Sequence, residues 1–204
     1  MRTELQTDQA DVRRITHQQV MAAALGVLET QGARSLVMRR LAEALDVSLP
    51  TLYVVIGSKE QLVIDLVRRA TGHLIDDGVA AEGTPLENSF EAFQRALNWL
   101  DQHRWFGDLI ALADSDQLVT AYASLDGTDT VLMAVVGEVI GLVDKGASTS
   151  VQRCLLTQGF VRALLLADEL SGVGLTGSPQ QRVQLAVDVF GALVEASRPR
   201  RVGV

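Results

Sequence analysis

Residues that commonly perform catalysis are few in this chain of 204 residues. The three histidines, His17, His73 and His103, are far apart, and none lies in the H-x-x-x-H or H-E-x-x-H spacing that holds zinc on one helix face. The sequence contains no G-x-S-x-G nucleophile motif and no Walker phosphate loop. Its single cysteine, Cys154, lies in an apolar context typical of a small core residue. These observations predict a protein that is not an enzyme and that holds no metal or cofactor.

Hydroxyl groups and cations of the kind that contact nucleic acid gather in the segment 36–66. Thr51 and Tyr53 carry hydroxyl groups and Lys59 carries an ammonium group, all of which donate to phosphate oxygens. They follow the turn Asp46-Val47-Ser48, which separates two short helical patterns. A helix of about seven residues is not stable alone, so its neighbours must hold it in place. This arrangement is typical of a helix-turn-helix, whose second helix enters the major groove with its N-terminal end first.

Charge is unevenly placed along the chain, whose formal net charge is −7. The first 72 residues carry a net charge of +1, whereas the remaining residues carry −8. The overall acidity therefore does not exclude nucleic acid as a partner of the N-terminal part. No apolar run approaches the roughly 18 residues that span a bilayer, and the N-terminus has no signal-peptide pattern. Because Cys154 also has no disulfide partner in the chain, we expect a cytoplasmic protein without a membrane partner.

Capping and helix-breaking residues divide the N-terminal part into four predicted helices. The first begins at the capping box Thr16-His17-Gln18-Gln19 and ends at Gly32. The second is short and stops at Asp46. Ser48 caps a third short helix, and a second capping box, Ser58-Lys59-Glu60-Gln61, opens the fourth.

The rest of the chain also has helical periodicity. A weak linker is expected over 76–83, followed by a helix that starts at the cap Thr84-Pro85-Leu86-Glu87. Shorter helices are expected over 105–125 and a long apolar one from Asp129 to Asp144. Ser148 or Thr149 caps the next helix, and after a loop at 172–177 the cap Ser178-Pro179 opens the last.

These patterns predict an all-α fold with two domains. A flexible arm is expected at residues 1–14 and a three-helix helix-turn-helix DNA-binding domain at 15–72. A larger helical domain is expected at 73–204.

The helix-turn-helix segment resembles the TetR family of repressors, most closely the tetracycline-repressor branch. The resemblance covers about the first third of the chain, and the remainder matches only in helical character and length. It implies a repressor that binds a palindromic DNA operator as a homodimer and is released by a small-molecule effector. The matching residues are Gly32, Arg39, Leu41-Ala42, Leu45, Val47-Ser48, Pro50-Thr51-Leu52-Tyr53, Ser58-Lys59 and Leu62.

The family resemblance also implies which residues touch DNA. Thr51 and Tyr53 match positions that contact phosphates or bases, and Lys59 matches a phosphate contact at a helix start. Arg39 matches a position that contacts base or phosphate, and Pro50 one that packs against thymine methyl groups. The complete predicted DNA-contacting set is Arg39, Ser48, Leu49, Pro50, Thr51, Tyr53, Val54 and Lys59.

Several positions depart from the family pattern. Leu49, Val54 and Val55 are apolar where the family often has polar or aromatic residues, and Val37 and Met38 replace threonines. These changes remove hydrogen-bonding groups from the surface that would face DNA. We therefore expect an operator recognised largely through methyl contacts, through an arginine of the second helix and through DNA shape.

The turn itself also departs from the family, since Asp46 replaces a glycine. Aspartate tolerates the left-handed backbone conformation better than most residues, so the turn should persist. Its carboxylate near phosphates nevertheless disfavours DNA binding. Arg40 is expected to face solvent and not DNA.

The C-terminal part is expected to hold the effector. Binding sites combine an apolar wall with a few polar groups, and the chain offers several aromatic residues together with His103. Aromatic residues at helical spacing fill a core more often than they line a pocket, so both interpretations stay open. The candidate lining residues are Phe93, Trp99, His103, Trp105, Phe106, Met133, Gln158, Phe160 and Arg162.

Two alternatives concern assembly and function. The helices at 129–144 and 179–197 are candidates for a four-helix dimer face, although their apolar stripes also suit the core of a single subunit. The alternative function is that of a TetR-like helical dimer that binds a ligand or protein and has weak or lost DNA binding. Apolar Leu49, Val54 and Val55 and acidic Asp46 motivate this second interpretation.

Overall fold

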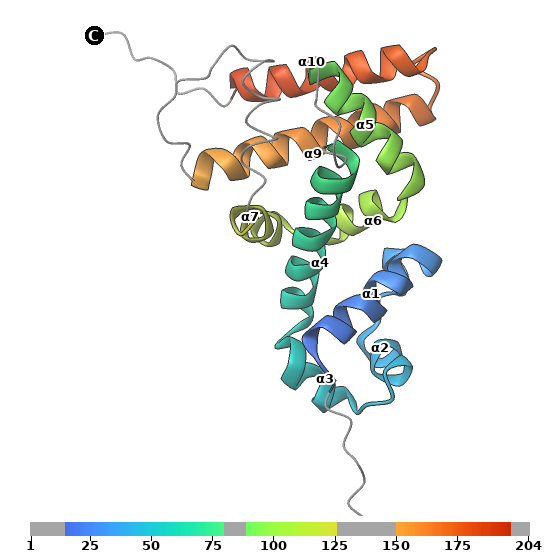
Figure 1. The fold of residues 1–204 in the computed structure, drawn as a ribbon, viewed down its shortest axis with the longest axis vertical. Coiled ribbons are helices and arrows are strands. Elements are labelled where there is room, and N and C mark those ends of the chain that lie inside the picture. The colour runs from blue at the N-terminus through green and yellow to red at the C-terminus, as the bar shows by residue number, and fades with distance from the viewer. Residues whose placement is uncertain (1–14, 80–88, 126–149, 197–204) are drawn as a thin grey trace, which may run out of the picture.

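The computed structural model describes residues 15–79, 89–125 and 150–196. Every regular element in these three ranges is a helix, which confirms the all-α fold (Figure 1). Several predicted features lie outside the described residues. They are the arm at 1–14, the cap at 84–87, the helix at 129–144 and the caps at Ser148 and Thr149.

The first predicted helix is confirmed as α1 (His17–Gln31). Both halves of its capping box form, because Gln19 N donates to Thr16 Oγ1 at 3.2 Å and Thr16 N donates to Gln19 Oε1 at 2.8 Å. Gly32 ends the helix with a φ of 76°, a backbone conformation that L side chains adopt with difficulty. A short 3₁₀ turn, η1 (Ala33–Ser35), leads on to the next helix.

Three further helices complete the N-terminal unit: α2 (Met38–Ala44), α3 (Leu49–Ile56) and α4 (Lys59–His73). The second capping box forms only in half. Ser58 Oγ accepts from Gln61 N at 3.1 Å, but the side chain of Gln61 donates to Asp65 Oδ1 at 3.2 Å. The prediction of a complete capping box is therefore wrong. The side chain of Gln61 does not accept from the backbone N–H of Ser58, because its amide donates to the buried carboxylate of Asp65 one turn further on.

Burial of apolar side chains holds the short α3 in place. Its Leu52 and Ile56, one turn apart, are buried, and α3 packs against α1, α2 and α4. Each fully buried leucine contributes about 1.5–3 kcal/mol of hydrophobic stabilisation. Tertiary packing thus stabilises a helix of eight residues that would not form alone. The buried side chains around it include Val20, Ala24, Leu28, Leu41, Leu62 and Leu66.

The predicted linker after the N-terminal unit is wrong over 76–79. The fourth helix continues as a π-helical turn, η2 (Leu74–Val79), because Leu74, Ile75 and Val79 are all buried. At Gly78 an added Cβ would lie 3.0 Å from Trp99 Cβ, so the backbone there packs directly against α5 (Ser89–Gln102). The expected boundary between residues 72 and 73 therefore falls within a continuous helical segment.

The C-terminal part is built from α5, α6 (Trp105–Leu112), α7 (Ser115–Ala123), α9 (Ser150–Gly172) and α10 (Pro179–Ala196). α9 and α10 lie side by side, and α4 runs from them to the N-terminal unit (Figure 1). The two short helices and the last helix confirm the sequence predictions for these segments. The loop begins after Gly172, and Ser178 Oγ caps α10 by accepting from Gln181 N at 3.2 Å.

Buried aromatic rings join three of these helices. Phe93 of α5 lies 4.9 Å from Phe160 of α9 and 5.6 Å from Phe190 of α10, measured between ring centroids. All three rings are fully buried. Offset and tilted ring pairs of this kind add about 0.5–1.5 kcal/mol each beyond the area they bury.

An ion-pair network joins the same helices at their edge. Arg182 of α10 donates to Asp101 of α5 at 2.9 Å and also pairs with Asp168 of α9. Arg104 donates to the same two carboxylates, at 2.7 Å to Asp101 and 3.0 Å to Asp168. The network fixes the ends of α5, α9 and α10 relative to one another.

Candidate nucleic-acid interface

The turn between α2 and α3 has the geometry predicted from Asp46. The φ of Asp46 is 55°, which places this residue in the left-handed region. No other non-glycine residue among the described ones has a positive φ. Asp46 N donates to Glu43 O at 3.2 Å and Val47 N donates to Ala42 O at 3.0 Å. The chain therefore turns tightly and lets α3 pack against α2.

Ser48 caps α3, as predicted. Thr51 N donates to Ser48 Oγ at 3.2 Å, and the hydroxyl groups of Ser48 and Thr51 are hydrogen-bonded at 2.7 Å. Pro50 lies in the first turn, where its missing N–H costs no helical hydrogen bond. The N-terminal end of α3 is thus formed by a hydroxyl pair joined by one hydrogen bond, in which one of the two O–H groups is left to donate outward.

The two faces of α3 differ sharply in exposure. Leu52 and Ile56 point into the core, whereas the side of the helix opposite them carries Val54, which is 84% exposed. Tyr53 and Val55 are partly buried and pack against the core. Val55 therefore belongs mainly to the packing of α3, while Val54 belongs to its outer surface.

Cations border this surface on two helices. Arg39 of α2 is largely exposed and lies 3.9 Å from Glu43 in a loose ion pair. Arg40 is exposed, as predicted. Lys59 is the exposed first residue of α4, so its ammonium group adds to the positive end of that helix.

The carboxylate of Glu60 lies at the same N-terminal end of α4 as Lys59. Hydrogen bonds from its own backbone N–H and from Ser58 lower the pKa of the Glu60 carboxyl from its ordinary value. Glu60 is thus an anion held at the N-terminal end of α4. Its charge opposes that of Lys59 where a phosphate would approach.

A buried carboxylate links the start of α1 to α4, and the sequence analysis missed it. Asp65 Oδ2 lies 2.9 Å from His17 Nε2, and Asp65 Oδ1 accepts from Arg68 at 3.1 Å and from Gln61 at 3.2 Å. The i, i+3 spacing of Asp65 and Arg68 was the only available signal, since His17 is 48 residues away in the sequence. The cluster fixes the first turn of α1 against the helix that carries Lys59.

The predicted effector residues that the structure describes separate into three groups, the third of which is Gln158 and Arg162. Trp99, His103, Trp105 and Phe106 pack on one another, with the Trp99 and His103 rings stacked at 4.0 Å and His103 Nδ1 2.8 Å from Trp99 O. Phe93 and Phe160 instead belong to the buried cluster with Phe190. Met133 lies outside the described residues.

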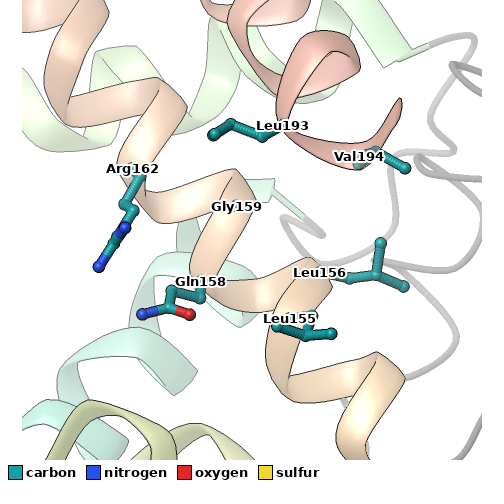
Figure 2. Close-up of a pocket in the computed structure, with 7 residues that line it drawn as sticks. All are labelled: Leu155, Leu156, Gln158, Gly159, Arg162, Leu193 and Val194. Atoms are coloured by element: carbon teal, nitrogen blue, oxygen red, sulfur yellow. The ribbon is translucent and has the colours of Figure 1, made fainter. Parts of the chain in front are cut away.

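Gln158 and Arg162 line a hollow of about 130 Å³ between α9 and α10. Figure 2 shows their side chains extending from the same side of α9, one turn apart, while Leu193 and Val194 come from α10. The remaining lining residues are Leu155, Leu156 and Gly159. The wall is thus mostly apolar, with an amide and a guanidinium group at one side.

Buried groups next to this region are inert. Burial raises the pKa of the Tyr122 phenol, and it also raises the pKa of the Cys154 thiol, which donates to Val119 O at 3.6 Å. A buried thiol with a raised pKa is a poor nucleophile. The interpretation of Cys154 as a small core residue is confirmed.

A glycine-rich segment at 172–177 resembles a dinucleotide-binding motif in spacing but not in structural context. Residues 172–177 have the sequence Gly-Val-Gly-Leu-Thr-Gly, which has the G-x-G-x-x-G spacing of dinucleotide-binding loops. That motif follows a strand and opens a helix, whereas this segment follows α9 and ends before α10. It therefore serves as the connection between two helices.

Two features are absent from the part of the chain that the structure describes. None of the helices in the described ranges is long and apolar enough to cross a membrane. Within the same ranges, no three His, Cys, Asp or Glu side chains gather closely enough to hold a metal ion.

Comparison with protein families assigns the N-terminal unit. Residues 20–66 match the model of the bacterial regulatory proteins of the tetR family. The match spans α2, the turn and α3, together with most of α1 and the first half of α4. The N-terminal unit is therefore a helix-turn-helix of the kind found in the tetR family of bacterial regulatory proteins. No curated protein matched the chain.

Proposed function

We propose that this protein is a repressor that binds a palindromic DNA operator as a homodimer and leaves it when a small-molecule effector binds. The observation that carries the proposal is the turn at Asp46 with the capped α3 beyond it, all within the segment that matches the family. A protein that acts on DNA works where the DNA is, so we place it in the cytoplasm.

The DNA contacts follow from the surface around α3. Val54, Leu49 and Pro50 face the groove, and Thr51 and Ser48 lie at the helix start that enters first. Arg39, Tyr53 and Lys59 approach the phosphates on either side. None of these contacts requires a change in the fold of the unit.

Dimerisation places two α3 helices on one operator. We propose that α9 and α10 supply the dimer face, because Leu155 and Leu166 of α9 are large apolar side chains exposed on the single chain. Each α3 then occupies one half-site, and the two half-sites multiply the affinity of a small DNA-binding unit. Analytical ultracentrifugation of the full chain should give twice its mass of 22.0 kDa.

The effector is proposed to bind in the C-terminal part. The hollow lined by Gln158 and Arg162 offers an apolar wall with two polar groups, a combination that binds small molecules. The aromatic group of Trp99, His103, Trp105 and Phe106 is the other proposed wall, although its rings are packed against one another.

A mobility shift on DNA from upstream of the protein's own gene tests DNA binding. The affinity should fall steeply as salt rises, because each phosphate contact releases counterions. A log-affinity slope near zero, or no shift at any salt concentration, would contradict the proposed function.

A second candidate function is favoured by one observation. The exposed part of α3 is apolar, and Asp46 and Glu60 add negative charge beside it. A helical dimer that binds a ligand or a protein and has little affinity for DNA would also present such a surface. The same mobility shift separates the two functions.

A further inference from the structure

The recognition helix lacks the side chains that hydrogen-bond to bases. The eight residues of α3, Leu-Pro-Thr-Leu-Tyr-Val-Val-Ile, include no Arg, Lys, Asn, Gln, Asp or Glu. Those six types make the specific hydrogen bonds to base edges in the major groove. Sequence recognition by α3 therefore cannot rest on bidentate hydrogen bonds.

The two hydroxyl groups of α3 each have a single O–H donor and cannot form a bidentate pair with a base edge. Thr51 Oγ1 is hydrogen-bonded to Ser48 Oγ at 2.7 Å, and this bond forms part of the helix cap. Tyr53 is partly buried against the core of the unit. The outermost side chain of the helix is instead Val54, directly opposite the buried Leu52 and Ile56.

An apolar ridge is what α3 presents to a partner. Pro50 and Val54 are four residues apart, so they are neighbours on one helix face, and both are exposed. Val54 is 84% exposed and Leu49 is 37% exposed at the helix start. In the major groove the apolar group available to such a ridge is the methyl on C5 of a pyrimidine.

We propose that Val54, with Pro50 beside it, is a specificity-determining residue that recognises C5-methyl groups of pyrimidines in the operator. The ligand chemistry is a 5-methylpyrimidine, supplied by thymine or by 5-methylcytosine. The inference rests on the proposed function, because it requires that α3 enters the major groove. The match of this segment to bacterial regulatory proteins favours duplex DNA over a protein as the occupant of the ridge, and Arg39 and Lys59 are exposed cations available to its phosphates.

The probe for the test is a DNA duplex that the protein itself selects. The full chain selects duplexes from a random library, and the best duplex is then made again with deoxyuridine in place of thymidine. Uracil lacks only the methyl group, so it keeps every hydrogen bond of thymine. Loss of one buried methyl contact should weaken binding about fourfold, and loss in both half-sites roughly 15-fold.

The same uracil substitution, measured on the V54A variant, tests whether Val54 makes the methyl contact. In V54A the same uracil substitution should change affinity by about twofold or less, because the contact is already gone. V173A is the matched control, since Val173 is 72% exposed but lies beyond α9. It should keep the full sensitivity to uracil. Both valines are exposed, so neither variant should lose its fold.

A third set of duplexes separates the two sources of methyl. At a position where uracil weakens binding, 5-methylcytosine paired with guanine should bind better than unmethylated cytosine paired with guanine. A duplex bound equally with thymine and uracil overturns this inference while leaving the proposed function intact, as does equal uracil sensitivity in the wild type and V54A. Failure to select any duplex, with no salt-dependent binding, overturns the proposed function itself.

Discussion

Single residues around α3 decide whether this surface suits DNA. Lys59 and Arg39 supply positive charge, whereas Asp46 and Glu60 supply negative charge close to them. The two kinds of charge act in opposite directions on an approaching phosphate. Substitutions that change one charge at a time measure each contribution.

Lys59 is expected to make one phosphate contact. K59Q should weaken binding to every operator sequence alike and reduce the slope of log affinity against log salt by about two per dimer, one for each subunit. R34Q is a suitable control, because Arg34 is exposed on η1, which packs against α6. A slope for K59Q equal to that of the wild type would remove Lys59 from the interface.

Asp46 is expected to oppose DNA binding. Asparagine tolerates the left-handed conformation that the turn requires, so D46N removes the charge and keeps the turn. Its affinity for the operator should rise by about two- to fivefold at low salt. D116N, on the exposed first turn of α7, should leave affinity unchanged. A fall in affinity for D46N would show that the carboxylate makes a favourable contact.

The helices themselves were largely predictable from sequence, because their signals are local. The caps at Thr16, Ser48 and Ser178 all form as predicted, and Gly32 ends α1. The prediction that the helix ends after residue 75 is wrong over 76–79. It rested on two aspartates and a glycine and gave too little weight to the apolar residues around them. Burial of Leu74 and Val79 against α5 decides the helix there, and burial is not visible in one sequence.

The close packing of η2 on α5 gives a prediction at the scale of elements. G78A should lower the free energy of unfolding by about 1–3 kcal/mol, because its methyl would meet Trp99 at 3.0 Å. G72A in α4 is the matched control, since nothing lies within 4 Å of its added Cβ. It should raise the free energy of unfolding by about 0.5–1 kcal/mol. Thermal denaturation of both variants measures the difference, and equal effects would contradict the packing argument.

Candidate sites were predictable to different degrees for the same reason. The proposed DNA-contacting residues lie within one segment, so a local motif is enough to predict them together. The ion-paired cluster of His17 and Asp65 joins residues 48 apart, and no local spacing indicates it. The proposed effector residues share only an aromatic or polar character, and the fold distributes them over separate groups.

At the scale of the whole molecule, α4 connects the two functional parts. It begins at Lys59 beside the DNA-facing surface and continues without a break through η2, which packs on α5 (Figure 1). The matched family segment ends at residue 66, in the middle of this helix. A ligand that shifts α5 or η2 would therefore move the helix that carries Lys59.

The central claim is that two copies of α3 occupy adjacent major grooves of one operator. Hydroxyl-radical footprinting of the full chain on DNA from upstream of its own gene tests it most directly. We expect two protected half-sites of opposite orientation, with centres about one helical turn, or a multiple of it, apart. A single protected site without symmetry, or no protection at a protein concentration that saturates dimer formation, would contradict it.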